Sequence, residues 1–384
     1  LGRGYDVGNR RDDAVASLGR ADELGKGADA ALRRRLAELL LSRALDETAG
    51  DRGDDLAKAR RFASQEPDLL LEIARAYASR GGAHEAAASA REVLALVPDD
   101  VDAALLLGSV LVKDNDPRGA AEAFELALRY QVDSIEALAG AGHAYLALGK
   151  SEEAVTMLRR AITVDADRLD AHAALAETQV SLGRTEQAAQ SYREVVRLAP
   201  ENADAWRILG ELLLSLGDAR EAAVALERSI ALRPADGGAL LSLATANERM
   251  GKSSEHVAAL EKAHRARPDD PEAAARYGLA LAQGADADAA IAMLERALRL
   301  AGARADVEAR LVGLLGERAA RRETGGDAKG AEADFAAAIA LSPEAVALRL
   351  GLARAYRAQG KAHEALSAAE EAVVVLLPSV ACPA

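Results

Sequence analysis

A period of about 34 residues constrains this chain more than any other feature, because it runs through most of the sequence. The segment from Ala203 to Asp236 contains one complete period. Within it, Trp206, Leu209 and Leu213 are spaced i, i+3, i+7, so they form one apolar stripe of a helix. Gly217 then ends that helix, since glycine enters the left-handed conformation of a helix end without steric cost.

A second helix follows in the same period, from about Arg220. Ala222 and Leu226 lie on its apolar side, and Pro234 stops it because proline cannot donate the next backbone hydrogen bond. Neither helix can cover its apolar stripe alone, so neighbouring periods must stack against one another. The sequence therefore predicts an all-α fold made of antiparallel helix pairs.

The landmarks of this period recur in register. Repeats of this length begin at Pro67, Val101, Ile135, Leu169, Ala203, Gly237 and Pro271. The glycine that ends the first helix recurs as Gly81, Gly149, Gly183, Gly217, Gly251, Gly326 and Gly360. Asn115 takes that place in the repeat from Val101, and asparagine is the next best residue for left-handed backbone. The small residue of the second helix recurs as Ala86, Ala120, Ala154, Ala188, Ala222, Ala290, Ala331 and Ala365.

These landmarks resemble the tetratricopeptide repeat (TPR) family. The family pattern has Trp, Leu, Gly and Tyr on the first helix, Ala and Phe on the second, and Pro at the turn. The matching residues of one repeat are Trp206, Leu209, Gly210, Leu213, Gly217, Ala222, Leu226 and Pro234. The resemblance implies a right-handed superhelical α-solenoid with about nine tandem repeats.

The repeats divide the chain into five expected segments. These are degenerate N-terminal TPR-like helices at 1–66, seven regular repeats at 67–304, an extended repeat at 305–345, a C-terminal repeat at 346–379 and a tail at 380–384. The extended repeat is longer than its neighbours by about two helical turns, so we expect a long first helix from Ala305 to about Thr324. Either a tolerated insertion or a dedicated contact element would explain it.

The composition limits the classes of partner that we expect. The formal net charge of -13 argues against nucleic-acid binding, which uses clustered Lys and Arg, and favours a protein partner with a basic or mixed surface. No stretch has the pattern of a signal peptide or a membrane-spanning helix. We therefore favour the cytoplasm, although the chain begins at Leu1 and the periplasm stays open if an N-terminal signal has been removed. Abundant arginine and alanine are typical of a high-GC bacterial source.

Catalytic and cofactor motifs are incomplete. His84-Glu85 begins like the HExxH zinc motif, but Ala88 stands where the second histidine must be. Gly140-Ala141-Gly142 weakly resembles a dinucleotide-binding turn, yet it lies inside a predicted helix with no strand before it. We expect no enzyme activity, no cofactor and no metal.

The expected site is the concave groove that, in the family, is lined by the first helix of each repeat. The fifth, ninth and twelfth residues of a repeat share one helix face. The expected groove residues are Leu105, Val112, His143, Leu146, Glu177, Val180, Arg207, Glu211, Leu214 and Leu241. They make an apolar floor with an acidic edge, suited to a protein or peptide partner that is apolar with some basic character. The alternative is that these Leu and Val residues only pad the edge of the core.

Two functions remain open at this point. The first is a non-enzymatic scaffold that binds a partner peptide or helix in its groove. The second is the substrate-recruiting arm of a larger bacterial enzyme or of a polysaccharide or secretion machine. A further expectation concerns the apolar run from Ala372 to Leu377, which no polar helix follows. Since an array needs a polar end for solubility, we expect its own tail from Pro378, a second copy of the chain or a following domain to cover it.

Overall fold

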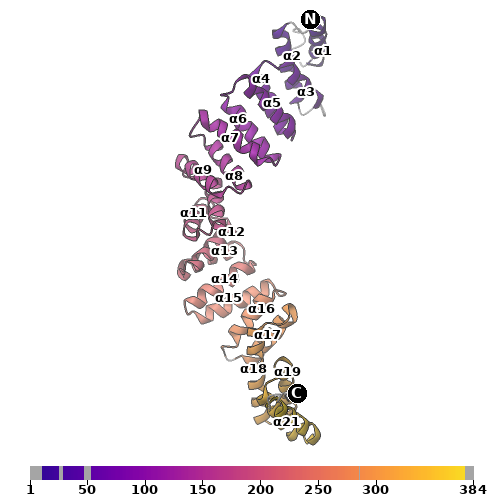
Figure 1. Ribbon diagram of the computed structural model, residues 1–384, viewed down its shortest axis with the longest axis vertical. Coiled ribbons are helices and arrows are strands. Elements are labelled where there is room, and N and C mark those ends of the chain that lie inside the picture. Colours follow the sequence, from indigo (N-terminus) through magenta and orange to yellow (C-terminus); the bar gives the residue numbers. More distant parts are fainter. Residues whose placement is uncertain (1–10, 26–28, 47–52, 285, 377–384) are drawn as a thin grey trace, which may run out of the picture. The chain divides into compact units, whose positions relative to one another are not determined.

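The computed structural model describes residues 11–25, 29–46, 53–284 and 286–376 (Figure 1). The chain divides into two compact units, a first unit from Leu1 to Pro200 and a second unit from Glu201 to Ala384. Most of the described residues are helical, and none of them belongs to a strand. The expected tail, the covering segment from Pro378 and the start of the degenerate N-terminal segment lie outside the described residues.

The helices of the first unit are α1 (Arg11–Leu24), α2 (Ala30–Ala44), α3 (Gly53–Phe62), α4 (Pro67–Ser79), α5 (Ala83–Leu96), α6 (Val101–Lys113), α7 (Pro117–Tyr130), α8 (Ile135–Ala147), α9 (Ser151–Val164), α10 (Leu169–Ser181) and α11 (Thr185–Leu198). Those of the second unit are α12 (Ala203–Ser215), α13 (Ala219–Leu232), α14 (Gly237–Arg249), α15 (Ser253–Ala266), α16 (Pro271–Leu281), α17 (Ala287–Ala301), α18 (Ala305–Thr324), α19 (Ala328–Leu341), α20 (Val346–Ala358) and α21 (Ala362–Leu376).

Helix pairs stack within each unit. Each first helix packs on the second helix of its own repeat, as α6 does on α7, and each second helix packs on the next first helix, as α7 does on α8. Successive first helices also touch, α4 with α6, α6 with α8 and α8 with α10. The result is the all-α solenoid expected from the sequence. The side formed by α4, α6, α8 and α10 is called the first-helix face below.

The turns inside the pairs have the expected conformation. The seven glycines predicted to end first helices all have positive φ, between 68° and 87°. Asn115 is the only described residue other than glycine with positive φ, at 58°. The sequence prediction is confirmed at each of these positions, because a side chain is rarely tolerated in this backbone region.

Alanine provides the close contact between helices. Ala120, Ala154, Ala188 and Ala222 are fully buried, as the repeat pattern predicts. Ala365 of the last pair is only partly buried. No described helix follows α21 in the stack, which agrees with the lower burial of Ala365.

Arginines connect one repeat with the next. Arg60 pairs with Glu92, Arg184 with Glu152, and Arg304 with Glu272, so each pair joins residues of neighbouring repeats. Arg249 of α14 donates a hydrogen bond to the carbonyl of Leu214 at the end of α12. Exposed ion pairs contribute little individually, about 0–1 kcal/mol each. Their spacing nevertheless shows that many of the charges serve contacts inside the array.

The extended repeat contains the long first helix that its length predicts. Helix α18 has 20 residues, and its C-terminal part is anchored to α19 through Asp334, whose exposed fraction is 4%. Arg318 donates to both oxygens of that carboxylate at 2.7 and 2.9 Å, and Arg322 donates at 2.8 Å. Arg318 also contacts Asp288 at 2.7 Å. The additional turns are therefore held by charge pairing as well as by apolar packing.

Candidate protein-interaction face

Three of the expected groove residues form a row on the first-helix face. Val112, Leu146 and Val180 occupy the same place near the C-terminal ends of α6, α8 and α10, which pack side by side. Val112 is 47% exposed and Val180 is 43% exposed. Leu146 is partly buried and packs against the core clusters on both sides. The row therefore combines core contact with exposed apolar surface.

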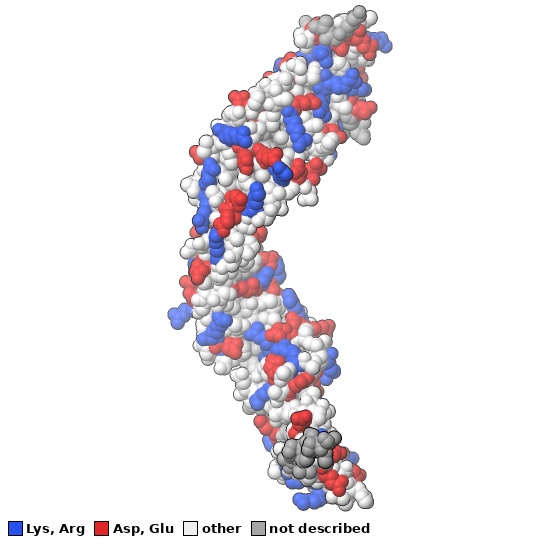
Figure 2. Space-filling view, in the orientation of Figure 1, with Lys and Arg blue, Asp and Glu red and all other residues white. Residues whose placement is uncertain are grey.

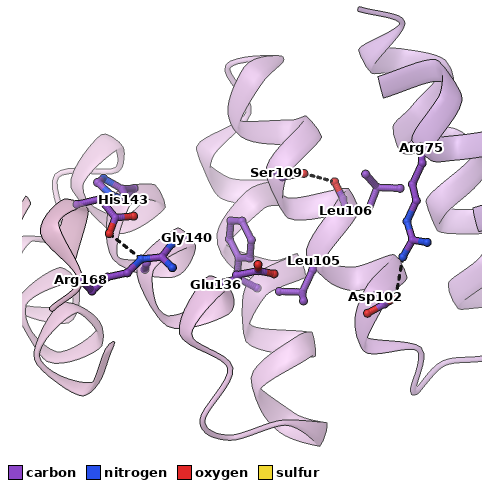
Figure 3. A pocket seen from close by; sticks show the side chains of 12 residues that line it. Arg75, Asp102, Leu105, Leu106, Ser109, Glu136, Gly140, His143 and Arg168 are labelled. Carbon is purple, nitrogen blue, oxygen red and sulfur yellow. Dashed lines mark hydrogen bonds and ion pairs between the residues drawn. The ribbon is translucent and has the colours of Figure 1, made fainter. Parts of the chain in front are cut away.

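Leu105 of α6 and His143 of α8 precede Val112 and Leu146 along their helices, and they line a cavity of about 510 Å³ (Figure 3). Ser109 and Ala139 complete its wall at the positions that alternate with them in the repeat. Phe124, from the second helix α7, reaches the cavity between α6 and α8. The structure thus brings Leu105 and His143 together around one concave site.

Charged side chains surround this cavity. Arg75 donates to Asp102 at 2.7 Å, and Arg168 donates to Asp170 at 2.7 Å (Figure 3). Burial alone would raise the pKa of Asp170, but the hydrogen bond and charge of Arg168 outweigh it, so the pKa lies below its ordinary value. Glu136 also lines the cavity, and no ion pair to it is found among the described residues.

The close fit of Phe124 explains two glycines of α6 and α8. A Cβ added at Gly140 would lie 2.5 Å from the Phe124 ring, and one added at Gly108 would lie 2.7 Å from it. A Cβ at Gly142 would lie 2.7 Å from Leu158. The Gly140-Ala141-Gly142 run is therefore helical, as the sequence predicts, and its glycines allow side chains of second helices to approach closely.

The expected groove residues of the second unit lie in a different environment. Leu214 is 8% exposed, so it offers little surface to a partner, contrary to the expectation of an exposed row. Arg207 contacts Glu211 at 2.8 Å and the buried Asp236 at 3.6 Å. Leu241 is partly buried against a core cluster. These groove residues are more involved in internal contacts than Val112 and Val180 are.

Glu177 of α10 is the remaining residue of the expected acidic edge, and it is exposed. Over the face visible in Figure 2, Lys and Arg alternate with Asp and Glu and do not form one large patch of either sign. Sequence reasoning missed Arg75, Glu136 and Arg168 as lining residues. A comparison of the ninth residues of the repeats, Arg75 and Ser109, would have drawn attention to Arg75.

Other kinds of site receive no support from the described part of the chain. Within it, no three His, Cys, Asp or Glu side chains are placed to hold a metal ion. None of the described helices combines the length and the apolar character needed to cross a membrane. The first-helix face combines exposed apolar side chains with a cavity, and it is the candidate site in the described residues.

Comparison with known proteins agrees with the fold. A family model described as tetratricopeptide repeat matches residues 71–134, 139–199, 173–239 and 318–381, which together make up more than half of the chain. The chain belongs to the tetratricopeptide repeat family. TPR arrays are built of stacked helix pairs that present an extended binding surface, and the chain is in this sense a protein–protein interaction scaffold.

Solved structures of TPR proteins resemble the chain at low sequence identity. The C-terminal part of a TPR repeat-containing protein from Cytophaga hutchinsonii is 15% identical, with a TM-score of 0.53 over 63% of this chain and 99% of that one. MamA is 24% identical, with a TM-score of 0.39 over 42% of this chain and 95% of its own. YrrB, described as a TPR protein with an unusual peptide-binding site, is 21% identical, with a TM-score of 0.43 over 48% and 95%. No curated protein sequence matches the chain significantly.

Proposed function

We propose that the first unit of this TPR protein binds an extended or helical segment of a partner protein along the first-helix face. One observation carries the proposal. Val112, Leu146 and Val180 recur at one position of three neighbouring first helices, and the two valines remain nearly half exposed. Single exposed apolar side chains are ordinary, whereas a row of them over adjacent helices makes a continuous apolar strip.

The strip would hold its partner mainly by desolvation. Burial of apolar surface contributes about 25 cal/mol per Å² before the costs of association. Glu177, on the same helix as Val180, would favour a segment with some basic residues and would affect orientation more than affinity. Glu211 is left out of this edge, because its carboxylate already pairs with Arg207.

The same face would serve the alternative left open by the sequence. In that interpretation, the chain recruits substrates to a larger bacterial enzyme or to a polysaccharide or secretion machine. The recruiting step would again be the capture of a protein segment by the first unit. That wider setting stays a prediction, and the binding experiment below applies to both versions.

The test is a selection of peptides on the intact chain. Peptides recovered from a random phage-displayed library would be synthesised, and their Kd values measured by fluorescence anisotropy on the wild type and on Val112→Glu/Val180→Glu. Loss of two valine contacts, at about 1 kcal/mol each, corresponds to at least about tenfold weaker binding. Both positions are nearly half exposed, so the unfolding midpoint should stay close to the wild-type value.

Val164→Glu is the matched control. Val164 is 42% exposed and ends α9, so it resembles Val180 in exposure and in its place near a helix C-terminus, but it lies on a second helix. Peptide affinity should be unchanged in this variant. Equal affinity of the double variant and the wild type would contradict the proposal. So would an equal loss in the control, or a library that yields no binding peptide.

A further inference from the structure

An acidic residue recurs at the second position of the first helix in most repeats, and it usually pairs with an arginine. Such pairs join Asp68 to Arg34, Asp102 to Arg75, Asp170 to Arg168, Asp204 to Arg233 and Glu272 to Arg304. Glu136 occupies the same position in α8, and among the described residues no arginine or lysine forms an ion pair with it. Glu136 is thus the exception in this series.

The reason lies one repeat earlier. Asp102 is paired by Arg75, the ninth residue of the preceding repeat. Counted from the Asp102–Arg75 pair, the equivalent partner of Glu136 is Ser109, one period after Arg75. Counted from the Glu272–Arg304 pair it is Arg168, whose guanidinium donates to Asp170 instead. The Ser109 side chain is too short to reach the Glu136 carboxylate, and its hydroxyl donates to the carbonyl of Leu106 at 2.8 Å instead. The cavity of about 510 Å³ lies between these residues, where the neighbouring repeat has an arginine side chain.

The charges around the cavity are unequal. Its lining includes three carboxylates, Asp102, Glu136 and Asp170, but only the guanidinium groups of Arg75 and Arg168. Each arginine has its aspartate at 2.7 Å. The pKa of Arg168 is raised first by its hydrogen bond to Asp170 and only last by the more distant charge of Glu136. Apart from His143, which also lines the cavity, the lining therefore has one carboxylate more than it has guanidinium groups, and Glu136 is the carboxylate without an ion pair among the described residues.

The cavity also has an apolar wall. Leu105 and Leu106 on α6 and the ring of Phe124 provide it, and Glu136 and Leu105 are seen near each other in the view of Figure 3. A long side chain with an alkyl stem and a positive head matches both the wall and the carboxylate.

We propose that this cavity receives an arginine or lysine side chain from the protein segment bound on the first-helix face, with its head at Glu136 and its stem against Leu105 and Phe124. The inference rests on the proposed function and specifies the partner further. The bound side chain would continue the series of acid–base pairs across the repeat in which Ser109 replaces arginine. An acidic partner residue fits less well, because it would have to detach Arg75 or Arg168 from its aspartate.

The position of Glu136 at a helix N-terminus calls for a control. It lies in the first turn of α8, where the helix dipole favours negative charge. Glu186 has the same place, second in α11, and is exposed, but it does not line this cavity. Glu186→Gln therefore controls for the loss of one charge at a helix N-terminus when compared with Glu136→Gln.

The experiment uses the peptides selected on the wild-type chain. We expect an arginine or lysine at a fixed distance from their apolar residues, and its replacement by Gln should weaken binding to the wild type by about tenfold, the scale of one charge-assisted hydrogen bond. Glu136→Gln should cause a similar loss and make the chain insensitive to that replacement, as a double-mutant cycle would measure. Glu186→Gln should leave affinity unchanged.

Ser109→Arg provides a second, independent variant. It places the chain's own guanidinium where the partner's side chain would bind, as Arg75 does for Asp102, and should weaken peptide binding by about tenfold without lowering the unfolding midpoint. Peptides that respond to Val112→Glu/Val180→Glu but bind equally to Glu136→Gln and Ser109→Arg would overturn this inference and leave the proposed function in place. Peptides that respond to none of these variants would overturn both.

Discussion

Gly140→Ala tests how tightly the floor of the cavity is packed. An alanine Cβ at this position would lie 2.5, 2.6 and 2.7 Å from three carbons of the Phe124 ring. On the α6 side the ring already lies close to the backbone at Gly108, where an added Cβ would be 2.7 Å from it, so there is little room for it to move that way. Phe124 is only 5% exposed, so the substitution must displace a buried aromatic side chain.

The magnitude follows from two opposing effects. Replacement of a mid-helix glycine by alanine favours the helix by about 1 kcal/mol. Overpacking costs typically about 1–3 kcal/mol, and a rigid ring confined on both sides lies toward the upper end. We expect Gly140→Ala to lower the free energy of unfolding by about 1–2 kcal/mol, the difference between these two effects. Urea denaturation followed by circular dichroism measures the change, and hydrogen exchange in α6–α8 locates it.

Gly313→Ala is the matched control, because no atom lies within 4 Å of a Cβ at that position in the middle of α18. The same substitution should there raise the free energy of unfolding, by about 0.5–1 kcal/mol. Phe124→Leu should relieve the Gly140→Ala defect, since Leu158 and Leu226 occupy the equivalent place in other repeats. A stabilised Gly140→Ala, or two singles whose effects simply add, would refute the reasoning.

Four other perturbations have definite expected outcomes. Gly326→Val, at φ 84°, should cost about 1 kcal/mol or more and reduce hydrogen-exchange protection in the C-terminal repeats while sparing the first unit. Asp334→Asn should lower the unfolding free energy by about 2 kcal/mol, since two arginines lose a buried carboxylate; an unchanged urea midpoint would contradict this. Val374 is 70% exposed, and its own tail, a second copy of the chain or a following domain is expected to cover it. If the second copy does so, Val374→Lys should reduce self-association in sedimentation velocity, and a wild type that is monomeric at high concentration excludes that alternative. The hydrogen bond from Arg233 lowers the pKa of Asp204 below its ordinary value. The Asp204–Arg233 pair therefore stabilises the fold above about pH 4, and this stabilisation is lost as the pH falls through the lowered pKa. Asp204→Asn should make the urea midpoint less pH-dependent between about pH 5 and 2.

The helix pairs and their turns could be predicted from the sequence because both depend on local rules. A position such as Gly217 must accommodate positive φ, and a position such as Ala222 must fit against a neighbouring helix, whatever the surroundings. Because the same residue types recur in several repeats, the positions of the helices and turns can be assigned even where a residue such as Asn115 departs from the pattern. The prediction of helices therefore holds through the described residues.

The exposure of individual groove residues could not be predicted in the same way, because it depends on side chains from the next repeat. Leu214 and Val112 have equivalent positions, yet Leu214 is 8% exposed and Val112 is 47% exposed. Arg249 reaches the end of α12 and donates to the Leu214 carbonyl. Ala147 has the corresponding place after Val112 and is too short to cover it. A repeat pattern therefore predicts on which helix face a residue lies, but it does not predict which side chains of the next repeat cover it.

The contacts of two phenylalanines with glycines were not predicted, although the sequence contains the information needed to predict them. Phe124 faces Gly140, and Phe335 faces Gly351, where an added Cβ would lie 2.5 Å from the ring. In both pairs the phenylalanine lies on a second helix and the glycine lies on the first helix that follows it, at the same sequence separation. This relation could have been found in the sequence once the register was known, and it would have explained Gly140 without any cofactor.

The way charges are paired along the chain affects which partners its acidic residues can attract. A net charge of -13 suggests general attraction for basic proteins, but acids such as Glu92, Glu152 and Glu272 are already paired with arginines of neighbouring repeats. Ions paired in this way contribute little net field at a distance. Glu136, where the series of second-position pairs is interrupted, should contribute to selectivity, because there a partner cation gains a contact that the chain does not already supply. It follows that an unrelated polycationic peptide without the apolar residues should bind weakly and lose affinity steeply as salt is raised. A segment that places a cation in the cavity and apolar side chains on Val112, Leu146 and Val180 should retain most of its affinity in the same salt.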